Sequence, residues 1–234
     1  MSDHLQHLDL AVDRVLMQIK PGQSLFVTPQ EPAAGSPYLR EQWIPVELFP
    51  GRITVEIPAR RVYAPGQILS VMAPVGSPIP IRSGIQRLLL IVEGVYPTPL
   101  MLLARQLMSG GVAVTLVLGG QATEYPLELL SPEIEILRSD TGWKWPEQMD
   151  TLNWADQVLV LAAANRQMEV YRHLYDVLRQ LRPHDLPDHL VSGLFYPRLA
   201  CGAGACQACE VPSNKDTLLA CSDGPAIDLK KVQF

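Results

Sequence analysis

The first 200 residues of the chain contain no cysteine. That part of the protein therefore has no disulfide and no thiolate metal ligand, and its stability has to come from the burial of apolar side chains. The composition supplies them, since 47% of the residues are hydrophobic and 18% are charged. We expect a packed core over most of the chain rather than disorder.

An excess of basic side chains and long apolar runs are also missing. The formal net charge is −5, from 19 Lys and Arg against 24 Asp and Glu, which argues against nucleic-acid binding. The apolar runs 88–92 and 158–164 are much shorter than the ~20 residues of a membrane span and have the length of buried strands. Because the first residues also lack a basic region before an apolar run, we expect no secretion signal and a cytoplasmic location.

Proline is abundant, and most of the 21 prolines lie between residues 21 and 100. Short β-rich runs at 24–28, 54–57 and 68–71 lie near the turn signals Pro21-Gly22 and Pro65-Gly66. Residues 8–20 fit a strand or a short helix equally well. This spacing fits a small antiparallel β-barrel or sandwich, and we predict the barrel, over residues 1–84.

The pattern changes at residue 85 to an alternation of strands and helices. Apolar runs at 87–92, 112–118, 133–137 and 157–162 are typical of buried strands, and 99–108 and 166–182 read as helices, the first with Thr98 as its N-cap. Such alternation predicts a parallel sheet with crossover helices, here a nucleotide-binding-like α/β domain over residues 85–190. Residues 185–198 read as a proline-punctuated linker. The expected fold class is thus α/β plus β, with a third part at 191–234.

All four cysteines lie in that last part, as Cys201-x4-Cys206-x2-Cys209-x11-Cys221. Three thiols in one glycine-bearing loop with a distant fourth are the plant-type ferredoxin arrangement for a [2Fe–2S] cluster, which takes two thiolates per iron. Gly202 and Gly204 suit such a loop because glycine reaches positive φ and lets the backbone approach closely. A hairpin between Cys209 and Cys221 would bring the fourth thiol to the second iron.

Two other readings of the cysteines stay open. Structural zinc usually takes two C-x2-C pairs on separate knuckles, whereas this chain has three thiols on one loop and a single one beyond it. Disulfides are disfavoured by the expected cytoplasmic location. The spacing favours the iron–sulfur cluster over both.

The segment Leu199-Ala-Cys-Gly-Ala-Gly-Ala-Cys-Gln-Ala-Cys209, followed by Cys221-Ser-Asp-Gly-Pro225, resembles the cluster motif of one family. That family is the electron-transfer subunit of heteromeric bacterial dihydroorotate dehydrogenase, within the ferredoxin–NADP reductase superfamily. The resemblance implies a flavin-binding barrel, an NAD-binding α/β domain and a C-terminal [2Fe–2S] segment, in that order. It implies electron relay through the cluster, admits FAD as a second cofactor, and implies a partner oxidoreductase subunit that is itself a flavoprotein.

The same resemblance implies three weaker cofactor-binding positions. Arg40, in Tyr38-Leu-Arg-Glu-Gln-Trp-Ile-Pro-Val46, stands where the family arginine pairs with the FAD pyrophosphate. Gly76 ends Ala73-Pro-Val-Gly76, which is similar to the family's G-P-L-G loop. Gly94 is the glycine that remains in the loop after the first α/β strand, where the family has a glycine-rich turn.

The sequence departs from the family at these same positions. Trp43 stands where the flavin motif has a hydroxyl, and Glu93 adds negative charge to the nucleotide loop. Leu161-Ala-Ala-Ala-Asn165 replaces the family's C-G-P motif. Two eroded motifs in one site indicate that nicotinamide binding is lost, so we do not expect the chain itself to oxidise NAD(P)H. The alternative function is a non-catalytic assembly or regulatory subunit that bears a cluster or zinc and has degenerate flavin and nicotinamide sites.

Overall fold

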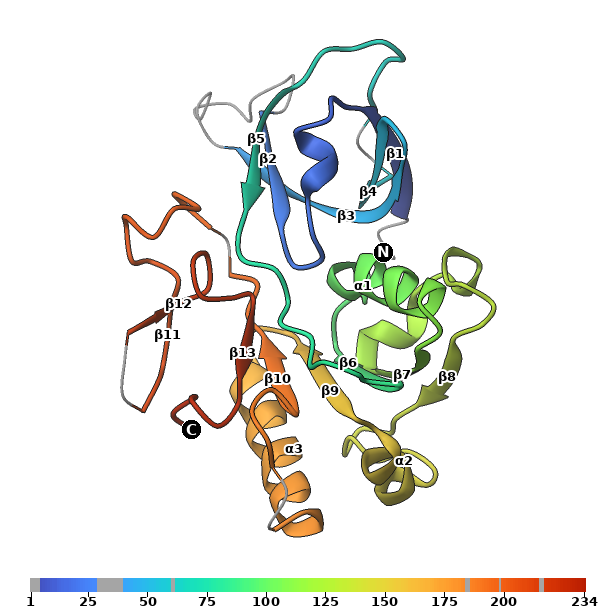
Figure 1. The fold of residues 1–234 in the computed structure, drawn as a ribbon, viewed down its shortest axis with the longest axis vertical. Helices are drawn as coiled ribbons and strands as arrows, with labels where there is room; N and C mark the ends of the chain where they lie inside the picture. The colour runs from blue at the N-terminus through green and yellow to red at the C-terminus, as the bar shows by residue number, and fades with distance from the viewer. Residues whose placement is uncertain (1–4, 29–39, 60–61, 184–185, 198, 215–216) are drawn as a thin grey trace.

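The structure is a computed structural model that describes residues 5–28, 40–59, 62–183, 186–197, 199–214 and 217–234. Figure 1 shows a β part above a layered α/β part, with the end of the chain running beside both. In the described residues no helix is long and apolar enough to cross a membrane.

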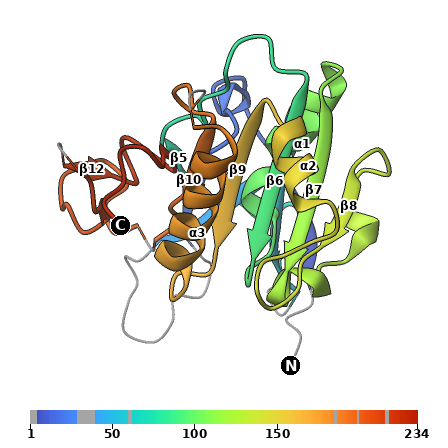
Figure 2. The same ribbon diagram turned by 90° about the horizontal axis from the view of Figure 1, so that it is seen from below.

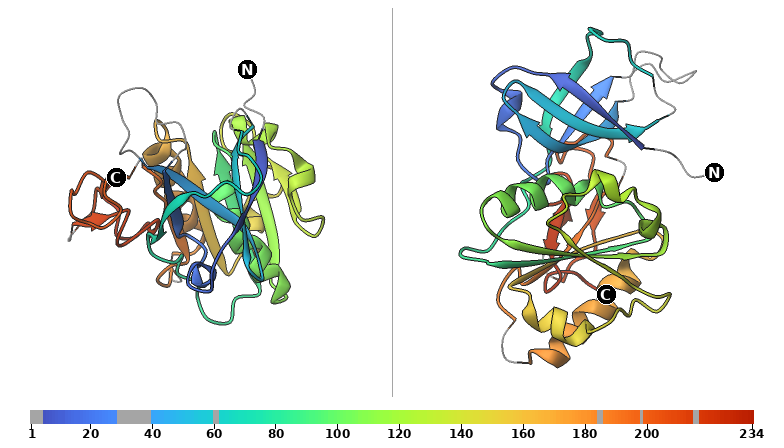
Figure 3. Two further views of the ribbon diagram at one scale, coloured as in Figure 1. Left: turned by 90° about the horizontal axis from the view of Figure 1, so that it is seen from above. Right: turned by 90° about the vertical axis from the view of Figure 1, so that its right-hand side faces the viewer.

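The β part is a five-stranded antiparallel sheet in the order β1-β4-β3-β2-β5. It curls around a core that includes Leu25, Trp43 and Val55 (Figure 3). The bounds are β1 Leu5–Ala11, β2 Ser24–Thr28, β3 Glu41–Phe49, β4 Arg52–Pro58 and β5 Ser70–Val75, with a short helical turn, η1, at Leu16–Gln18.

This sheet confirms the expected antiparallel β part and settles the ambiguous start of the chain. Residues 5–11 form β1, and the helical turn follows it. β3 is not among the strands that the sequence predicts, because part of it lies in the segment that resembles the flavin motif. β5 also begins two residues later and ends four residues later than the run at 68–71.

The α/β part has a six-stranded sheet in the order β13-β10-β9-β6-β7-β8. All neighbouring strands are parallel except β10 and β13. The bounds are β6 Arg87–Glu93, β7 Ala113–Gly119, β8 Glu135–Arg138, β9 Gln157–Ala162, β10 Val191–Leu194 and β13 Ala226–Asp228.

Helices cover both faces of this sheet, as Figure 2 shows from below. On the face toward the barrel lie α1 (Thr98–Ser109) and the helical turns η2 (Gly120–Glu124) and η3 (Leu127–Leu129), and on the other face lie α2 (Gln148–Trp154) and α3 (Gln167–Leu181). The central strands β6, β7 and β9 are buried over almost their whole length and are mostly apolar, as expected of strands covered on both sides, whereas the edge strand β8 has no buried residue.

Two details of this part differ from expectation. The predicted linker at 185–198 contains β10, because Val191 and Leu194 are buried and pair beside β9. Thr98 does not cap α1 with its side chain; its hydroxyl instead donates to Glu56 on β4. β10 and β13 come from the predicted third part, whose boundaries with the α/β domain stay predictions.

The barrel and the α/β part are joined through the buried carboxylate of Glu56. It accepts hydrogen bonds from Thr98 and from the Tyr125 hydroxyl at 2.6 Å, and it lies 3.2 Å from Nε2 of His7. Arg105 of α1 adds a donor to the Val46 carbonyl at 2.6 Å. Because these groups come from β1, β3, β4, α1 and the loop after β7, they fix the barrel on the sheet.

Candidate metal centre

Residues 199–225, here called the cysteine segment, leave the end of β10 and return to the sheet at β13. Between them Glu210–Val211 (β11) and Leu218–Leu219 (β12) pair as a small antiparallel hairpin. The Ala220 N–H donates to the Cys209 carbonyl at 2.9 Å, which continues the hairpin to its two cysteines. The hairpin predicted between Cys209 and Cys221 is therefore confirmed.

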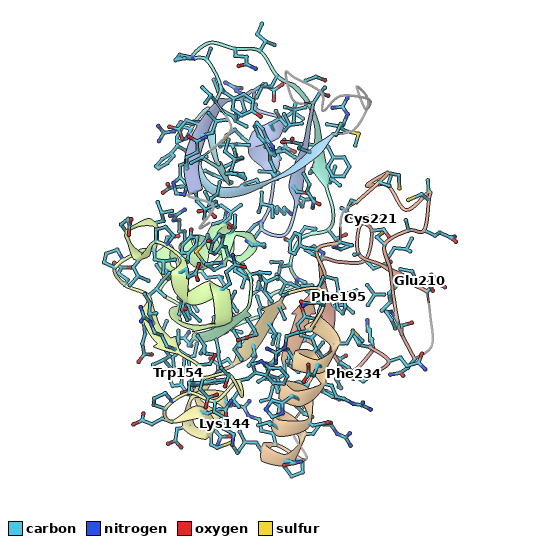
Figure 4. All side chains as sticks on the ribbon, turned by 180° about the vertical axis from the view of Figure 1, so that it is seen from behind. Lys144, Trp154, Phe195, Glu210, Cys221 and Phe234 are labelled. Atoms are coloured by element: carbon cyan, nitrogen blue, oxygen red, sulfur yellow. The ribbon has the colours of Figure 1, made fainter. Side chains whose placement is uncertain are left out.

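The hairpin brings two cysteines together that are distant in sequence. The sulfurs of Cys209 and Cys221 lie 3.2 Å apart, and both residues are buried in the core beneath α3. Figure 4 shows Cys221 at the end of the segment that faces the barrel, and Phe195 between that segment and α3. Burial, together with the neighbouring Cys209 thiol, raises the pKa of Cys221 to about 11.

The other two cysteines form a second pair on the loop itself. Cys201 is partly exposed and Cys206 is exposed. Backbone N–H groups of Ala203 and Cys206, and the Cys206 thiol, lower the pKa of Cys201 to about 6. Gly204, which lies between Cys201 and Cys206, donates its N–H to Sγ of Cys221 at 3.2 Å, so the two pairs are neighbours.

The loop backbone turns its N–H groups toward the sulfurs. The N–H of Gly204 donates to Sγ of Cys221 at 3.2 Å, and that of Ala203 donates to Sγ of Cys201 at 3.4 Å. Gly202 and Gly204 have φ values of 66° and 74°, in the left-handed region that favours glycine. The expected role of these two glycines is consistent with their backbone geometry.

The donor set fits a two-iron cluster better than a single metal ion. In the part of the chain that the structure describes, no three or more His, Cys, Asp or Glu side chains form a metal-binding group, so the choice between the metals depends on how the four thiols are paired. A tetrahedral zinc site needs four ligands around one ion, whereas a [2Fe–2S] cluster takes two thiolates on each of two irons. The two adjacent thiol pairs of this chain match the cluster, with one pair for each iron.

The three other predicted positions all form hydrogen bonds within the chain. The Arg40 guanidinium donates to the Phe26 carbonyl on β2 at 3.3 Å. Gly76 follows β5, and its carbonyl accepts a bond from the Gln23 amide at 3.0 Å. Gly94 donates its N–H to the Gly119 carbonyl at 3.0 Å, at the carboxyl end of β6. Each lies on a different element, and each is engaged with the chain's own backbone.

Glu93 occupies the sheet edge where such folds bind nucleotides. Its carboxylate lies against the strand ends so closely that a Cβ at Gly119 would overlap it, and one at Gly120 would lie 2.9 Å from Oε1. The residue is 6% exposed, and its nearest cation is Arg166 at 3.9 Å. Burial raises the pKa of Glu93, and the charge of Arg166 opposes that change. A phosphate at this edge would meet a buried acid.

A cavity of about 410 Å³ lies at the carboxyl ends of β9 and β10, beside Cys209. Aromatic and aliphatic side chains form most of its wall, and its single charged lining residue within the described chain is Glu210. No lining cation is therefore available there to a dinucleotide phosphate. The lining residues are Val95, Tyr96, Pro99, Leu161, Ala162, Ala164, Gln167, Met168, Phe195, Tyr196, Pro197, Cys209, Glu210, Val211 and Pro212.

Sequence reasoning missed several residues around the cysteine segment. Ser77 after β5 donates its N–H to the Gly224 carbonyl at 2.9 Å and its hydroxyl to the Ser222 carbonyl at 2.5 Å. Asp223 accepts the Leu219 N–H at 2.8 Å and closes the turn that carries Cys221. No spacing rule marks such residues, because their roles depend on contacts between distant parts of the chain.

Comparison with known proteins agrees with the cysteine motif. Residues 197–233 match the iron–sulfur cluster binding domain of dihydroorotate dehydrogenase B. The electron transfer subunit of dihydroorotate dehydrogenase B (NAD(+)) from Geobacillus sp. (strain WCH70) is 29% identical over 182 residues, which cover 72% of this chain and 66% of the relative. The matched region thus spans just under two thirds of the relative.

Solved structures show the same fold at lower identity. The NADH-dependent reduced ferredoxin–NADP oxidoreductase is 19% identical with a TM-score of 0.71, over 98% of this chain and 85% of the other. Ferredoxin–NADP⁺ reductase from Plasmodium falciparum is 11% identical with a TM-score of 0.51, over 78% and 87% of the two chains. The chain is therefore similar to the electron transfer subunit of dihydroorotate dehydrogenase B, and it has the fold of the ferredoxin–NADP reductases.

Proposed function

We propose that Cys201, Cys206, Cys209 and Cys221 hold a [2Fe–2S] cluster and that the protein relays single electrons to or from a partner oxidoreductase. The observation that carries the proposal is the arrangement of the four thiols as two adjacent pairs, with Cys209 and Cys221 buried in the core and with Cys201 partly and Cys206 fully exposed on the loop. Such a cluster, when bound, supplies the exchange of one electron at a time.

The residues around the thiols have distinct roles in this proposal. Ala203 and Gly204 donate N–H groups to sulfur, which stabilises negative charge there and tunes the reduction potential. The buried pair, Cys209 and Cys221, anchors the site to the core under α3. The exposed residues 205–208 leave the Cys206 side open to a partner.

The partner proposed from the relatives is the flavoprotein subunit that acts on dihydroorotate, in the cytoplasm. The related subunit is named for electron transfer in dihydroorotate dehydrogenase B, and the same segment carries the cluster-binding match. Four free thiols are compatible with a reducing compartment, where clustered cysteines more often bind metal than form disulfides.

The test is anaerobic purification followed by analysis of iron, acid-labile sulfide and zinc, with the visible spectrum and the EPR spectrum of the dithionite-reduced protein. The proposal predicts iron and sulfide in equal amounts and the signal of a reduced [2Fe–2S] cluster. A colourless protein with bound zinc would instead support the assembly or regulatory alternative.

A further inference from the structure

The barrel has a wall that faces the cysteine segment, and this wall carries the predicted flavin position Gly76. A crevice runs between the two, bordered by Ser24, Gln42 and Gly76 on one side and by Ala220 and Pro225 on the other. Its free volume is about 10 Å³. Pockets for organic ligands hold roughly 300–1,000 Å³, so the ring system of a flavin has no space here.

The cysteine loop itself closes the crevice. Its backbone at Gly202 lies so near the barrel that a Cβ there would be 2.7 Å from Cγ1 of Val75 and 3.1 Å from Cε2 of Phe26. Val75 ends β5 and Phe26 lies in β2, and both are at least 97% buried. The loop therefore packs directly on the barrel strands, and only glycine fits at the point of contact.

Hydrogen bonds also join the barrel to the cysteine segment. The N–H of Ser77 donates to the Gly224 carbonyl at 2.9 Å, and its hydroxyl donates to the Ser222 carbonyl at 2.5 Å. Both acceptors lie in the turn that follows Cys221. The barrel thus contacts the cysteine segment on both sides of the site, at Gly202 of the loop and at the turn after the fourth cysteine.

The polar side chains that border the crevice already form hydrogen bonds within the chain. The Gln42 amide donates to the Ser24 hydroxyl at 3.0 Å, and that hydroxyl donates to the Val75 carbonyl at 3.3 Å. The indole of Trp43 is buried in the barrel core, with its ring 5.3 Å from that of Tyr63. The position that holds a hydroxyl in the family motif therefore points away from the crevice.

We infer that the barrel of this protein clamps the cysteine loop in place of a flavin, so that the chain carries no FAD and the cysteine site is its one redox centre. The inference deepens the proposed function, since it concerns the site to which that function is assigned. Electrons would then enter and leave the chain one at a time. The chain would contain no group that accepts the two electrons of a hydride.

The test for FAD uses the full-length chain purified anaerobically, with flavin released by acid and measured by fluorescence. The inference predicts no stoichiometric flavin, and no quenching of FAD fluorescence when the purified protein is titrated into it. Flavin at about one per chain, before or after incubation with FAD, would overturn the inference. Iron and sulfide are measured on the same samples, so that the absence of a cluster, which would contradict the proposed function, is distinguished from the flavin result.

The clamp is tested with Val75→Ala and Ser77→Ala, which remove the apolar and the polar contact to the cysteine segment. Val71→Ala, on the same strand but packed in the barrel core, is the matched control. The inference predicts that the visible absorption of the cluster decays several-fold faster in air for both variants than for the control. If Val75→Ala folds poorly, the rate of cluster decay in Ser77→Ala is sufficient to test the clamp. Decay at the control's rate would overturn the clamp.

Discussion

The sulfurs of Cys209 and Cys221 lie 3.2 Å apart in the core, where the hairpin β11–β12 brings them together. This contact needs the whole hairpin, since 12 positions separate the two residues in the chain. It places one thiol pair against the apolar core under α3, while the pair of Cys201 and Cys206 stays on the loop surface. The four thiols are thus divided into a buried pair and a surface pair.

Replacing either member of the buried pair should abolish the cluster. Cys221→Ser keeps the size of the side chain but removes the sulfur that Cys209 contacts and that Gly204 bonds. We expect loss of visible absorption and of the EPR signal, with iron falling to background. Ser222→Ala, next in the chain, is the control that should keep the cluster. Full iron content in Cys221→Ser would exclude Cys221 as a ligand.

The two loop glycines should differ in their tolerance of alanine. Both have positive φ, which strains any other residue, but a Cβ at Gly202 would also press on Val75, whereas one at Gly204 would meet its nearest neighbour at 3.7 Å. We therefore expect Gly202→Ala to lose cluster content more severely than Gly204→Ala. Iron per chain after identical purification measures this. Equal losses would mean that backbone strain alone decides the outcome.

Removing the Tyr125 hydroxyl should weaken the junction between the barrel and the sheet. The hydroxyl donates to the buried Glu56 carboxylate at 2.6 Å, and burial raises its pKa above the ordinary value. Tyr125→Phe leaves that carboxylate short of a donor and should cost about 1–3 kcal/mol of the free energy of unfolding. Chemical denaturation measures the change. Tyr96→Phe is the control, since its ring packs on Tyr125 without reaching Glu56.

The ion pair of Arg87 and Asp156 should make stability depend on acid pH. Hydrogen bonds from the Arg87 side chain, at 2.8 Å for the closest, hold the pKa of Asp156 below its usual range. Its contribution is then complete above the unfolded pKa of about 4 and is lost as pH falls through the lower folded pKa.

Asp156→Asn should accordingly lower the melting temperature at neutral pH, by an amount worth roughly 1 kcal/mol for a partly exposed pair. The difference from wild type should shrink as pH falls below about 4. Asp176→Asn, an exposed carboxylate on α3, should change little at any pH. A difference that stays constant down to the acid limit would show that the Asp156 charge does not act through its lowered pKa.

NADH should fail to reduce the protein. The strand-end edge is filled by Glu93, and the cavity beside Cys209 has no basic lining residue in the described chain. We expect the visible spectrum to stay unchanged with excess NADH and to bleach with dithionite. Rapid bleaching by NADH alone would contradict both the closed edge and the absence of a hydride acceptor.

Local pattern was enough to predict the central strands of the parallel sheet, since β9 has the expected bounds and β6 ends one residue beyond them. It was also enough for the thiol hairpin, because Pro212 and the polar residues after it read as a turn between two strand ends. These features depend on neighbours in the sequence.

Contacts between distant segments could not be predicted in the same way. The sequence around β10 reads as a linker, because a strand of four residues between prolines shows little periodicity. In the structure these four residues pair with β9. Thr98 reads as a cap, but a buried carboxylate from the barrel accepts its hydroxyl. The closure of the barrel wall by Gly202 depends on Phe26 and Val75, which no motif connects.

The most direct test of the account is the metal content of the anaerobically purified wild-type chain, measured with its EPR spectrum after reduction. Four thiols in two pairs predict two iron and two sulfide per chain, with the signal of one reduced [2Fe–2S] cluster. One zinc per chain, with no iron and no signal, would contradict the account.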